Sequence, residues 1–131
     1  MSVVLDSFSL IAFFENESGA AKVAELLKNA NENEKNLYLS VVNWGEVYYI
    51  MYRNGGRSAA EEALRNIESL PIEIVPADQE MTHIAAEFKA NNKMSYADAF
   101  AAALTKQRKA KLVTGDKEFK AIEHDIKIIW I

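Results

Sequence analysis

The sequence contains no cysteine, which excludes disulfide bonds and thiolate metal ligands and is typical of a reducing compartment. It also contains no apolar run close to the roughly 20 residues that a membrane-spanning helix requires. An apolar, strand-like segment begins within the first few residues and leaves no room for a signal peptide. We therefore expect a cytoplasmic protein without a membrane segment.

Proline, glycine and histidine are also scarce, with two, five and two residues in a chain of 131. No stretch rich in proline or glycine divides the chain, and no repeat or low-complexity segment is present. A chain of this length can bury about two-thirds of its unfolded surface in one core. We therefore expect residues 1–131 to form a single domain, and we assign no role to the isolated His83 and His124.

Basic residues are outnumbered by acidic ones, 15 against 19, which gives a formal net charge of −4. A protein that binds nucleic acid through its overall charge carries the opposite sign. Any nucleic-acid binding by this chain must therefore depend on a local group of basic residues.

Short apolar segments alternate with segments of helical periodicity along the whole chain. The expected strands cover residues 3–5, 37–39, 72–75, 112–114 and 126–131. The expected helices cover residues 8–14, 19–31, 41–54, 58–70, 79–91 and 96–109, with Gly55 and Gly56 between the third and the fourth. The expected N-caps of the second, third, fifth and sixth helices are Ser18, Ser40, Asp78 and Ser95. Because buried strands that alternate with helices form a parallel sheet covered on both faces, the sequence predicts an α/β fold. We expect a three-layer α/β/α sandwich with a short parallel sheet of about five strands.

Four acids stand where strands end or where helices begin. Asp6 follows the first strand directly, and Asp116 follows the fourth by two residues. Glu46 and Asp98 lie in the first turns of helices 41–54 and 96–109. The carboxyl ends of parallel strands and the neighbouring helix N-termini lie along one edge of a doubly wound sheet. We therefore expect the four carboxylates to meet at this edge.

Four carboxylates in contact cannot all stay ionised without a positive charge among them. With no cysteine and only two histidines, the possible ligands are mainly oxygen atoms, which suits Mg²⁺ or Mn²⁺. Such an ion can activate a water molecule and neutralise the charge that develops on a phosphodiester. The pattern therefore predicts a metal site that is suited to phosphodiester hydrolysis.

Each acid, taken alone, also has an ordinary structural interpretation. Asp98 can complete a capping box with Ser95, and Asp116 can be a turn residue. Glu46 can be a solvated helix acid, although its neighbours are large and apolar. Asp6 is the hardest to explain in this way, because a lone charge at the end of a buried strand is unfavourable unless it is paired or bound to a metal.

Four segments of the sequence resemble those of the PIN-domain ribonuclease family, and more narrowly those of VapC-type toxins of type II toxin–antitoxin systems. They are VVLDS (residues 3–7), NWGEV (43–47), SYADAF (95–100) and LVTGDKEF (112–119). Their order and intervals match over essentially the whole chain. The resemblance implies a PIN-like fold and a Mg²⁺-dependent endoribonuclease that leaves a 5′-phosphate and a 3′-hydroxyl. It also implies a homodimer and a cognate antitoxin protein as partners.

The resemblance also assigns residues to the site. The catalytic and metal-binding acids would be Asp6, Glu46, Asp98 and Asp116. The supporting hydroxyls would be Ser7 and Thr114.

A nuclease with an acidic balance needs a basic rim around its site to hold RNA. The candidates are Arg53, Arg57, Lys89, Lys93 and Lys117. Lys93 and Lys117 flank proposed ligands and come first, followed by Arg53. Ordinary solvated side chains are the alternative interpretation of these residues. A bound cation would offset part of the repulsion between the site and a phosphate.

Trp44, Tyr48 and Tyr52 form an i, i+4, i+8 stripe on helix 41–54. Such stripes usually face a core. This helix is apolar on nearly all sides, however, so it is either wholly buried or gives one side to a partner. Because partner surfaces favour aromatic residues and methionine, we expect the stripe to contact a second copy or an antitoxin.

Three other functions are weighed against the nuclease. A haloacid-dehalogenase-like phosphatase also begins with a strand ending in Asp, but it requires a second acid two residues later, where this chain has Phe8. A phosphoacceptor receiver domain would use Asp78 as its acceptor. It also requires paired acids after the first strand and a lysine after the last, and this chain has neither. A catalytically silent PIN-like module that keeps only its partner surface is the non-enzymatic alternative. All four acids are present, which favours the nuclease.

Overall fold

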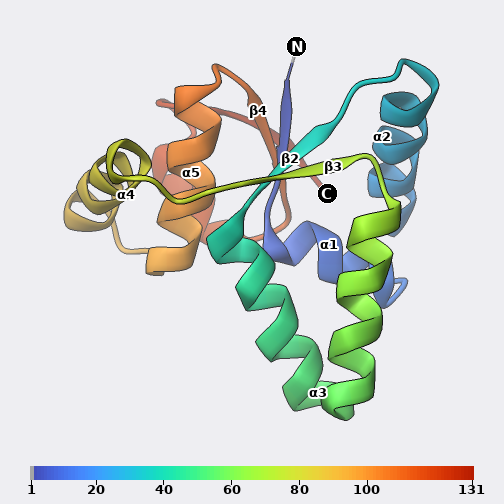
Figure 1. The fold of residues 1–131 in the computed structure, drawn as a ribbon. Helices are drawn as coiled ribbons and strands as arrows, with labels where there is room; N and C mark the ends of the chain where they lie inside the picture. The colour runs from blue at the N-terminus through green and yellow to red at the C-terminus, as the bar shows by residue number, and fades with distance from the viewer. Residues whose placement is uncertain (1) are drawn as a thin grey trace.

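The computed structural model describes residues 2–131 and contains a five-stranded, wholly parallel sheet with the strand order β3-β2-β1-β4-β5. The strands are β1 (Val3–Leu5), β2 (Leu37–Ser40), β3 (Ile72–Val75), β4 (Lys111–Thr114) and β5 (Lys127–Trp130). The helices are α1 (Ser7–Phe14), α2 (Ala20–Glu32), α3 (Val41–Ser69), α4 (Gln79–Asn91), α5 (Tyr96–Gln107) and a short 3₁₀ helix, η1 (Lys117–Ile122). The helices α4 and α5 lie on one side of the sheet, and α1 and α2 lie on the other (Figure 1). The predicted α/β/α fold is confirmed.

Adjacent residues of the two central strands face opposite sides of the sheet, and each side has its own core. In β1, Val4 belongs to the core on the α4 and α5 side, whereas Leu5 belongs to the core formed with α1, α2 and α3. In β4, Leu112 and Val113 are divided in the same way. All four side chains are fully buried. The carboxyl ends of β1 and β4 are therefore held from both faces of the sheet.

The helix α3 consists of two arms that meet at a sharp bend (Figure 1). The bend is at Gly56, whose φ of 82° lies outside the helical region and is readily adopted by glycine. The two arms correspond to the predicted helices 41–54 and 58–70. Between them, the Tyr48 hydroxyl donates a hydrogen bond of 3.0 Å to Glu61 Oε1.

Most of the helix starts follow the capping pattern in the sequence. The confirmed N-caps of α3, α4 and α5 are Ser40, Asp78 and Ser95. Asp6 is an additional N-cap that forms a capping box with Ser9 at the start of α1. The expected cap at Ser18 is wrong, because α2 begins after Gly19, which makes no side-chain cap. Gly19 has a φ of 94°, a left-handed conformation that glycine adopts without strain.

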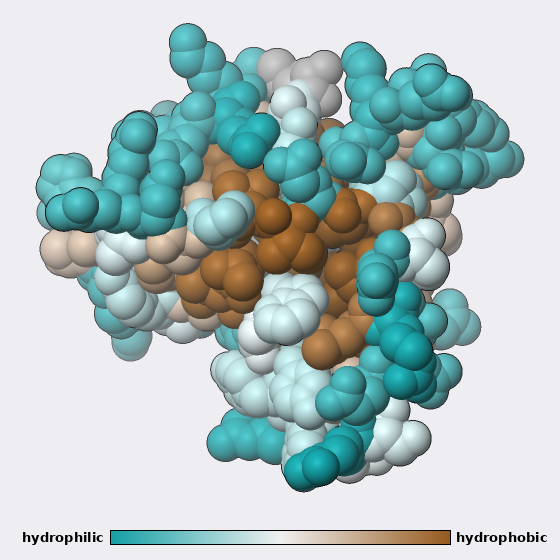
Figure 2. Space-filling view, in the orientation of Figure 1, coloured by the Kyte–Doolittle hydropathy of each residue, from teal (hydrophilic) through white to brown (hydrophobic). Residues whose placement is uncertain are grey.

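No helix among residues 2–131 is long and apolar enough to cross a membrane. Apolar residues nevertheless gather at the surface between the α4–α5 pair and the arms of α3 (Figure 2). Part of this face is a groove of about 590 Å³, lined mainly by Val41, Trp44, Leu64, Ile72 and Ile74. The apolar surface therefore lies beside the arm of α3 that carries the predicted aromatic stripe.

Candidate active site

Asp6 ends β1 and caps α1, so a strand and a helix fix its backbone from both sides. It is 1% exposed. Its Oδ1 accepts a hydrogen bond of 2.8 Å from the Ser9 backbone N–H, and its Oδ2 accepts one of 2.5 Å from the Thr114 hydroxyl. Burial raises the pKa of Asp6 to about 6, although both hydrogen bonds favour the ionised form and oppose the shift. Asp6 is therefore a buried acid whose ionisation depends on a few specific donors.

Glu46 lies in the first arm of α3 and contacts α1 through a hydroxyl group. The Ser7 hydroxyl donates a hydrogen bond of 2.6 Å to Glu46 Oε1. The Asn43 side-chain amide donates a second one, of 3.2 Å, to the same oxygen. Ser7 thus joins the helix that follows β1 to the helix that follows β2.

Asp98 lies in the first turn of α5, and its pKa shows that the other acids are near. Burial makes the largest contribution, and repulsion from the carboxylates of Asp116, Asp6 and Glu46 adds to it, raising the pKa of Asp98 to about 8. The backbone N–H of Asp98 also donates a hydrogen bond of 3.1 Å to Ser95 Oγ, so the residue is part of the helix cap as well. The charges of the other three predicted acids therefore act on Asp98, although the residues come from distant parts of the chain. Among the described residues, the group whose carboxylate oxygens lie within 4.8 Å of one another includes Asp98 and Asp116 but not Asp6 or Glu46.

Asp116 follows β4 and is the N-cap of η1. Its backbone N–H donates a hydrogen bond of 3.0 Å to Thr114 Oγ1, and its Oδ1 accepts one of 3.0 Å from the Glu118 backbone N–H. Carboxylate oxygens of Asp98, Asp116 and Glu118 lie within 4.8 Å of one another. Glu118 was not predicted from the sequence to belong to the site, because an exposed acid beside a turn resembles any solvated side chain. Its proximity to Asp98 depends on how η1 turns after β4.

Asn43 is a second residue at the site that the sequence analysis missed. It is fully buried, and its Nδ2 donates hydrogen bonds to Glu46 Oε1 and, at 3.1 Å, to the Ala97 carbonyl oxygen. Its Oδ1 is buried without a hydrogen-bond partner. The available signal in the sequence was a polar residue within an apolar helix, three positions before Glu46.

Gly115 stands between Thr114 and Asp116 and allows α1 to approach the end of β4. A Cβ atom at this position would overlap the ring of Phe8 and would lie 3.1 Å from the Ile131 carbonyl oxygen. A larger residue would therefore push α1 away from the strand end that carries Asp116.

The side chains at this site fit a hard divalent cation. The group of Asp98, Asp116 and Glu118 offers three carboxylate oxygens close enough together to hold one ion, and such oxygens are preferred by Mg²⁺ and Mn²⁺. Burial raises the pKa of Asp6 and of Asp98, and repulsion from neighbouring carboxylates adds to the shift, so a positive charge at this place would stabilise the ionised forms. A cation would satisfy these groups together.

A family model described as the PIN domain matches residues 3–125, which is nearly the whole chain. The chain belongs to the PIN-domain family. PIN domains are nucleases that use divalent metal ions, in agreement with the acidic cluster. A comparison of the sequence with curated proteins finds no match.

Solved structures similar to this PIN domain include chains from toxin–antitoxin complexes. One is VapBC2 from Rickettsia felis bound to a DNA fragment from its promoter, with a TM-score of 0.77, 17% identity and 98% of each chain covered. Another is VapBC-1 from nontypeable Haemophilus influenzae, with a TM-score of 0.72, 18% identity and coverage of 99% and 98%. A third is VapC20 from Mycobacterium tuberculosis, a sarcin–ricin loop cleaving toxin, with a TM-score of 0.70, 17% identity and coverage of 92% and 94%. At sequence identities this low, the similarity to these solved structures establishes the fold alone.

The basic residues predicted to hold RNA lie on the surface of the PIN domain. Lys93 precedes α5, which carries Asp98, and Lys117 follows Asp116 directly as the first residue of η1. Both are exposed. Arg53 is also exposed, and its guanidinium group lies 5.5 Å from the centre of the Tyr49 ring. Their role in RNA binding stays a prediction.

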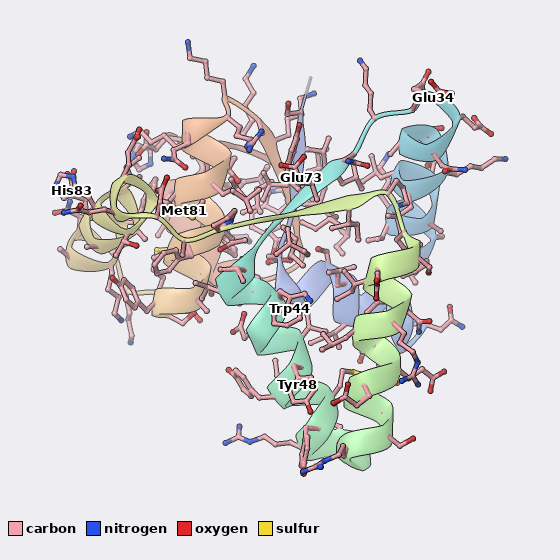
Figure 3. The ribbon with its side chains drawn as sticks, viewed as in Figure 1. Glu34, Trp44, Tyr48, Glu73, Met81 and His83 are labelled. Atoms are coloured by element: carbon pink, nitrogen blue, oxygen red, sulfur yellow. The ribbon has the colours of Figure 1, made fainter. Side chains whose placement is uncertain are left out.

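Trp44 and Tyr48 of the predicted aromatic stripe lie on the first arm of α3 (Figure 3), which also contains Tyr52. Trp44 and Tyr48 are half-buried, and Tyr52 is 40% exposed. The rings of Tyr48 and Tyr52 lie 5.9 Å apart. The stripe is therefore only partly covered by its own chain, and contact with a partner stays a prediction.

The raised pKa values predict that the metal-free PIN domain loses stability as the pH increases. In the unfolded chain both Asp6 and Asp98 ionise near their ordinary pKa of 3.8, whereas in the folded chain they hold protons up to about pH 6 and about pH 8. From the ordinary pKa of 3.8 up to about pH 8, the folded state therefore binds more protons than the unfolded state. Over this range the free energy of unfolding falls as the pH rises. Thermal melts in EDTA from about pH 5 to pH 8.5 should show a decreasing melting temperature.

At the upper end of this range, Mg²⁺ at ten times its dissociation constant should restore roughly 1.4 kcal/mol of stability. A metal-free melting temperature that rises from pH 5 to pH 8.5 would contradict the prediction.

Proposed function

We propose that this PIN-domain protein is a metal-dependent endoribonuclease that hydrolyses phosphodiester bonds of RNA and acts as the toxin of a toxin–antitoxin pair. The observation that carries the proposal is the group of carboxylates of Asp98, Asp116 and Glu118, whose oxygens lie within 4.8 Å of one another. Repulsion from Asp116, Asp6 and Glu46 adds to burial in raising the pKa of Asp98 to about 8. Such a buried acidic cluster weakens the fold on its own, and clusters with strongly shifted pKa values are typical of functional sites. The toxin assignment is supported by similarity to VapC20, which is described as a sarcin–ricin loop cleaving toxin.

In this proposal the acids hold Mg²⁺ or Mn²⁺ and the neighbouring hydroxyls hold the acids. The four ligands would be Asp6, Glu46, Asp98 and Asp116, with Glu118 as a further carboxylate at the same ion. The Thr114 hydroxyl fixes Asp6, and the Ser7 hydroxyl fixes Glu46. When bound, the ion would activate water and neutralise charge on the phosphate. Because neither cysteine nor a serine–histidine pair is part of the cluster, we propose hydrolysis by water without a covalent intermediate.

We further propose that the RNA backbone is held by Lys93 and Lys117, with Arg53 as a more distant contact. Lys117 supports this view because it is exposed and directly follows Asp116. Removing a lysine that binds one phosphate should reduce the salt dependence of RNA binding by about one unit of slope. Binding isotherms of Lys93→Ala and Lys117→Ala at several salt concentrations measure this.

The direct test is cleavage of a labelled pool of structured RNAs by the purified, partner-free protein. We expect cleavage in Mg²⁺ or Mn²⁺ and none in EDTA, because the ion activates the attacking water. The water forms a new bond to phosphorus and the bond to the 3′-oxygen breaks, so the products should carry a 5′-phosphate and a 3′-hydroxyl and no 2′,3′-cyclic phosphate. Cleavage that persists in EDTA, or that continues at the full rate in Asp6→Asn, would defeat this assignment.

The proposed partners are a cognate antitoxin and a second copy of the chain. Two features support them: the aromatic stripe is incompletely covered, and the groove beside it is largely apolar. Similar chains come from complexes named VapBC. Sedimentation of the isolated chain tests the second copy, and a monomer at all concentrations would exclude it. We also propose that residues 1–131 act as one domain and in the cytoplasm, where RNA and an antitoxin are available.

A further inference from the structure

We propose that Asn43 is a positioning residue of this site, whose amide holds the Glu46 carboxylate in a fixed orientation against the first turn of α5, next to Asp98. The inference rests on the proposed function, because it gives Asn43 a task in metal binding by the same acids. It concerns a residue that does not itself carry a charge and that the sequence pattern did not single out.

The side-chain amide of Asn43 bridges two helices. One N–H donates a hydrogen bond of 3.2 Å to Glu46 Oε1 in α3, and the other donates one of 3.1 Å to the Ala97 carbonyl oxygen in α5. Both amide hydrogens are therefore used. Exchanging the positions of Oδ1 and Nδ2 would set an acceptor against a carboxylate and a carbonyl group, so these contacts determine the orientation of the amide. The bridge sets the distance between Glu46 and the residue that precedes Asp98.

Glu46 is held on one side of its carboxylate. The Ser7 hydroxyl, at 2.6 Å, and the Asn43 amide, at 3.2 Å, both donate to Oε1. Neither of them contacts Oε2, which stays available to a ligand. Two donors from α1 and α3 thus stop the carboxylate from rotating and leave one of its oxygens for the cation. Such support of a ligand is a recurring feature of metal sites.

The burial of Asn43 favours this role over a purely structural one. The residue is 0% exposed, yet its Oδ1 has no hydrogen-bond partner. A buried, unpaired carbonyl oxygen destabilises the fold, and an apolar side chain of similar size would avoid that effect. An asparagine at this position is therefore explained by what its N–H groups do for Glu46.

The test compares Asn43→Leu and Asn43→Ser with the wild-type chain. Leucine keeps the number and branching of the side-chain heavy atoms, with somewhat more volume, but removes both donors, whereas serine keeps one donor. Two quantities are measured for each full-length protein: the affinity for Mn²⁺ by calorimetry, and kcat and KM for RNA cleavage. We expect Asn43→Leu to lower the Mn²⁺ affinity and kcat by roughly 10- to 100-fold with KM unchanged, and Asn43→Ser to recover part of the loss.

Thr105→Val is the matched control for loss of a buried hydrogen bond. Thr105 is 1% exposed, and its hydroxyl donates a hydrogen bond of 2.8 Å to the Ala101 carbonyl oxygen in α5, away from the acids. We expect this variant to melt at a lower temperature but to keep its Mn²⁺ affinity and kcat. Because Ser7 and Asn43 donate to the same oxygen, the effects of Ser7→Ala and Asn43→Leu should not be additive.

Two outcomes would overturn the inference while leaving the proposed function in place. One is an Asn43→Leu protein that folds, binds Mn²⁺ and cleaves RNA like the wild type; the other is an equal loss in Thr105→Val. If Asn43→Leu does not fold, Asn43→Ala, which removes volume rather than adding branched carbon, is measured in its place. A wild-type chain that neither binds Mn²⁺ nor cleaves RNA would overturn the proposed function as well.

Discussion

Asp98→Asn is expected to slow RNA cleavage by roughly a hundredfold or more. At pH values above about 8, the metal-free variant should also melt at a higher temperature than the metal-free wild type. The amide has nearly the shape of the carboxyl group but no charge. It relieves the repulsion from Asp116, Asp6 and Glu46 that helps to raise the pKa of Asp98 to about 8. It also removes a proposed ligand of the cation. Activity and metal-free stability should therefore change in opposite directions.

Cleavage rates at saturating Mg²⁺ and thermal melts in EDTA measure the two effects. Below about pH 4 the carboxyl group of Asp98 is protonated in both the folded and the unfolded wild type, so the two proteins should melt alike there, and the advantage of the variant should grow as the pH rises toward 8. Asp125→Asn is the matched control, because Asp125 is an exposed acid that contacts Lys106 near the other end of α5. It should change neither property. An Asp98→Asn protein that melts lower than the wild type above pH 8 would indicate that helix capping is the main role of this acid.

Thr114→Val should both inactivate and destabilise the protein, because one hydroxyl serves two of the acids. The hydroxyl donates to Asp6 Oδ2 at 2.5 Å and accepts from the Asp116 backbone N–H at 3.0 Å. Valine has almost the same shape but leaves a buried carboxylate and a backbone N–H without a partner. We expect a loss of about 1–3 kcal/mol in the free energy of unfolding at neutral pH. We also expect a loss of roughly 10- to 100-fold in cleavage rate.

The pH dependence distinguishes this from a general loss of packing. The hydrogen bond from Thr114 lowers the pKa of Asp6, so its removal should move that pKa above the present value of about 6. The acidic limb of the pH–rate profile should shift to higher pH in Thr114→Val and stay in place in Thr114→Ser, which keeps the hydroxyl. Equal profiles for valine and serine would show that Thr114 matters for packing alone.

The local elements were predictable because their signals are local. The β-branched run around Val4, the cap at Ser95 and the glycine pair at Gly56 each act within a few residues. Ser18 was a wrong prediction for the same reason: a serine and a glycine can both start a helix, and the left-handed backbone at Gly19 decided between them.

Asn43 and Glu118 could not be assigned in this way. The importance of Asn43 depends on Ala97, which comes from another helix, and that of Glu118 depends on the turn that brings its carboxylate near Asp98. Neither contact leaves a pattern in the sequence, because the partners are joined by the fold and not by spacing. The same holds for the groove beside Trp44, which combines the two arms of α3 with the edge strand β3.

The sequence by itself determined the order of strands and helices and the place of Asp6, Glu46, Asp98 and Asp116 at strand ends and helix starts. Backbone preferences and the alternation of apolar and polar residues are properties of short segments, so they can be seen without the fold. The tertiary structure alone decided how far each acid is desolvated and which donors it receives. Desolvation and charge repulsion depend on every atom packed around a group, and those atoms come from all parts of the chain. For this reason the placement of these acids at strand ends and helix starts could be predicted from the sequence, whereas the raised pKa of Asp98 and the bridge through Asn43 to Ala97 could not.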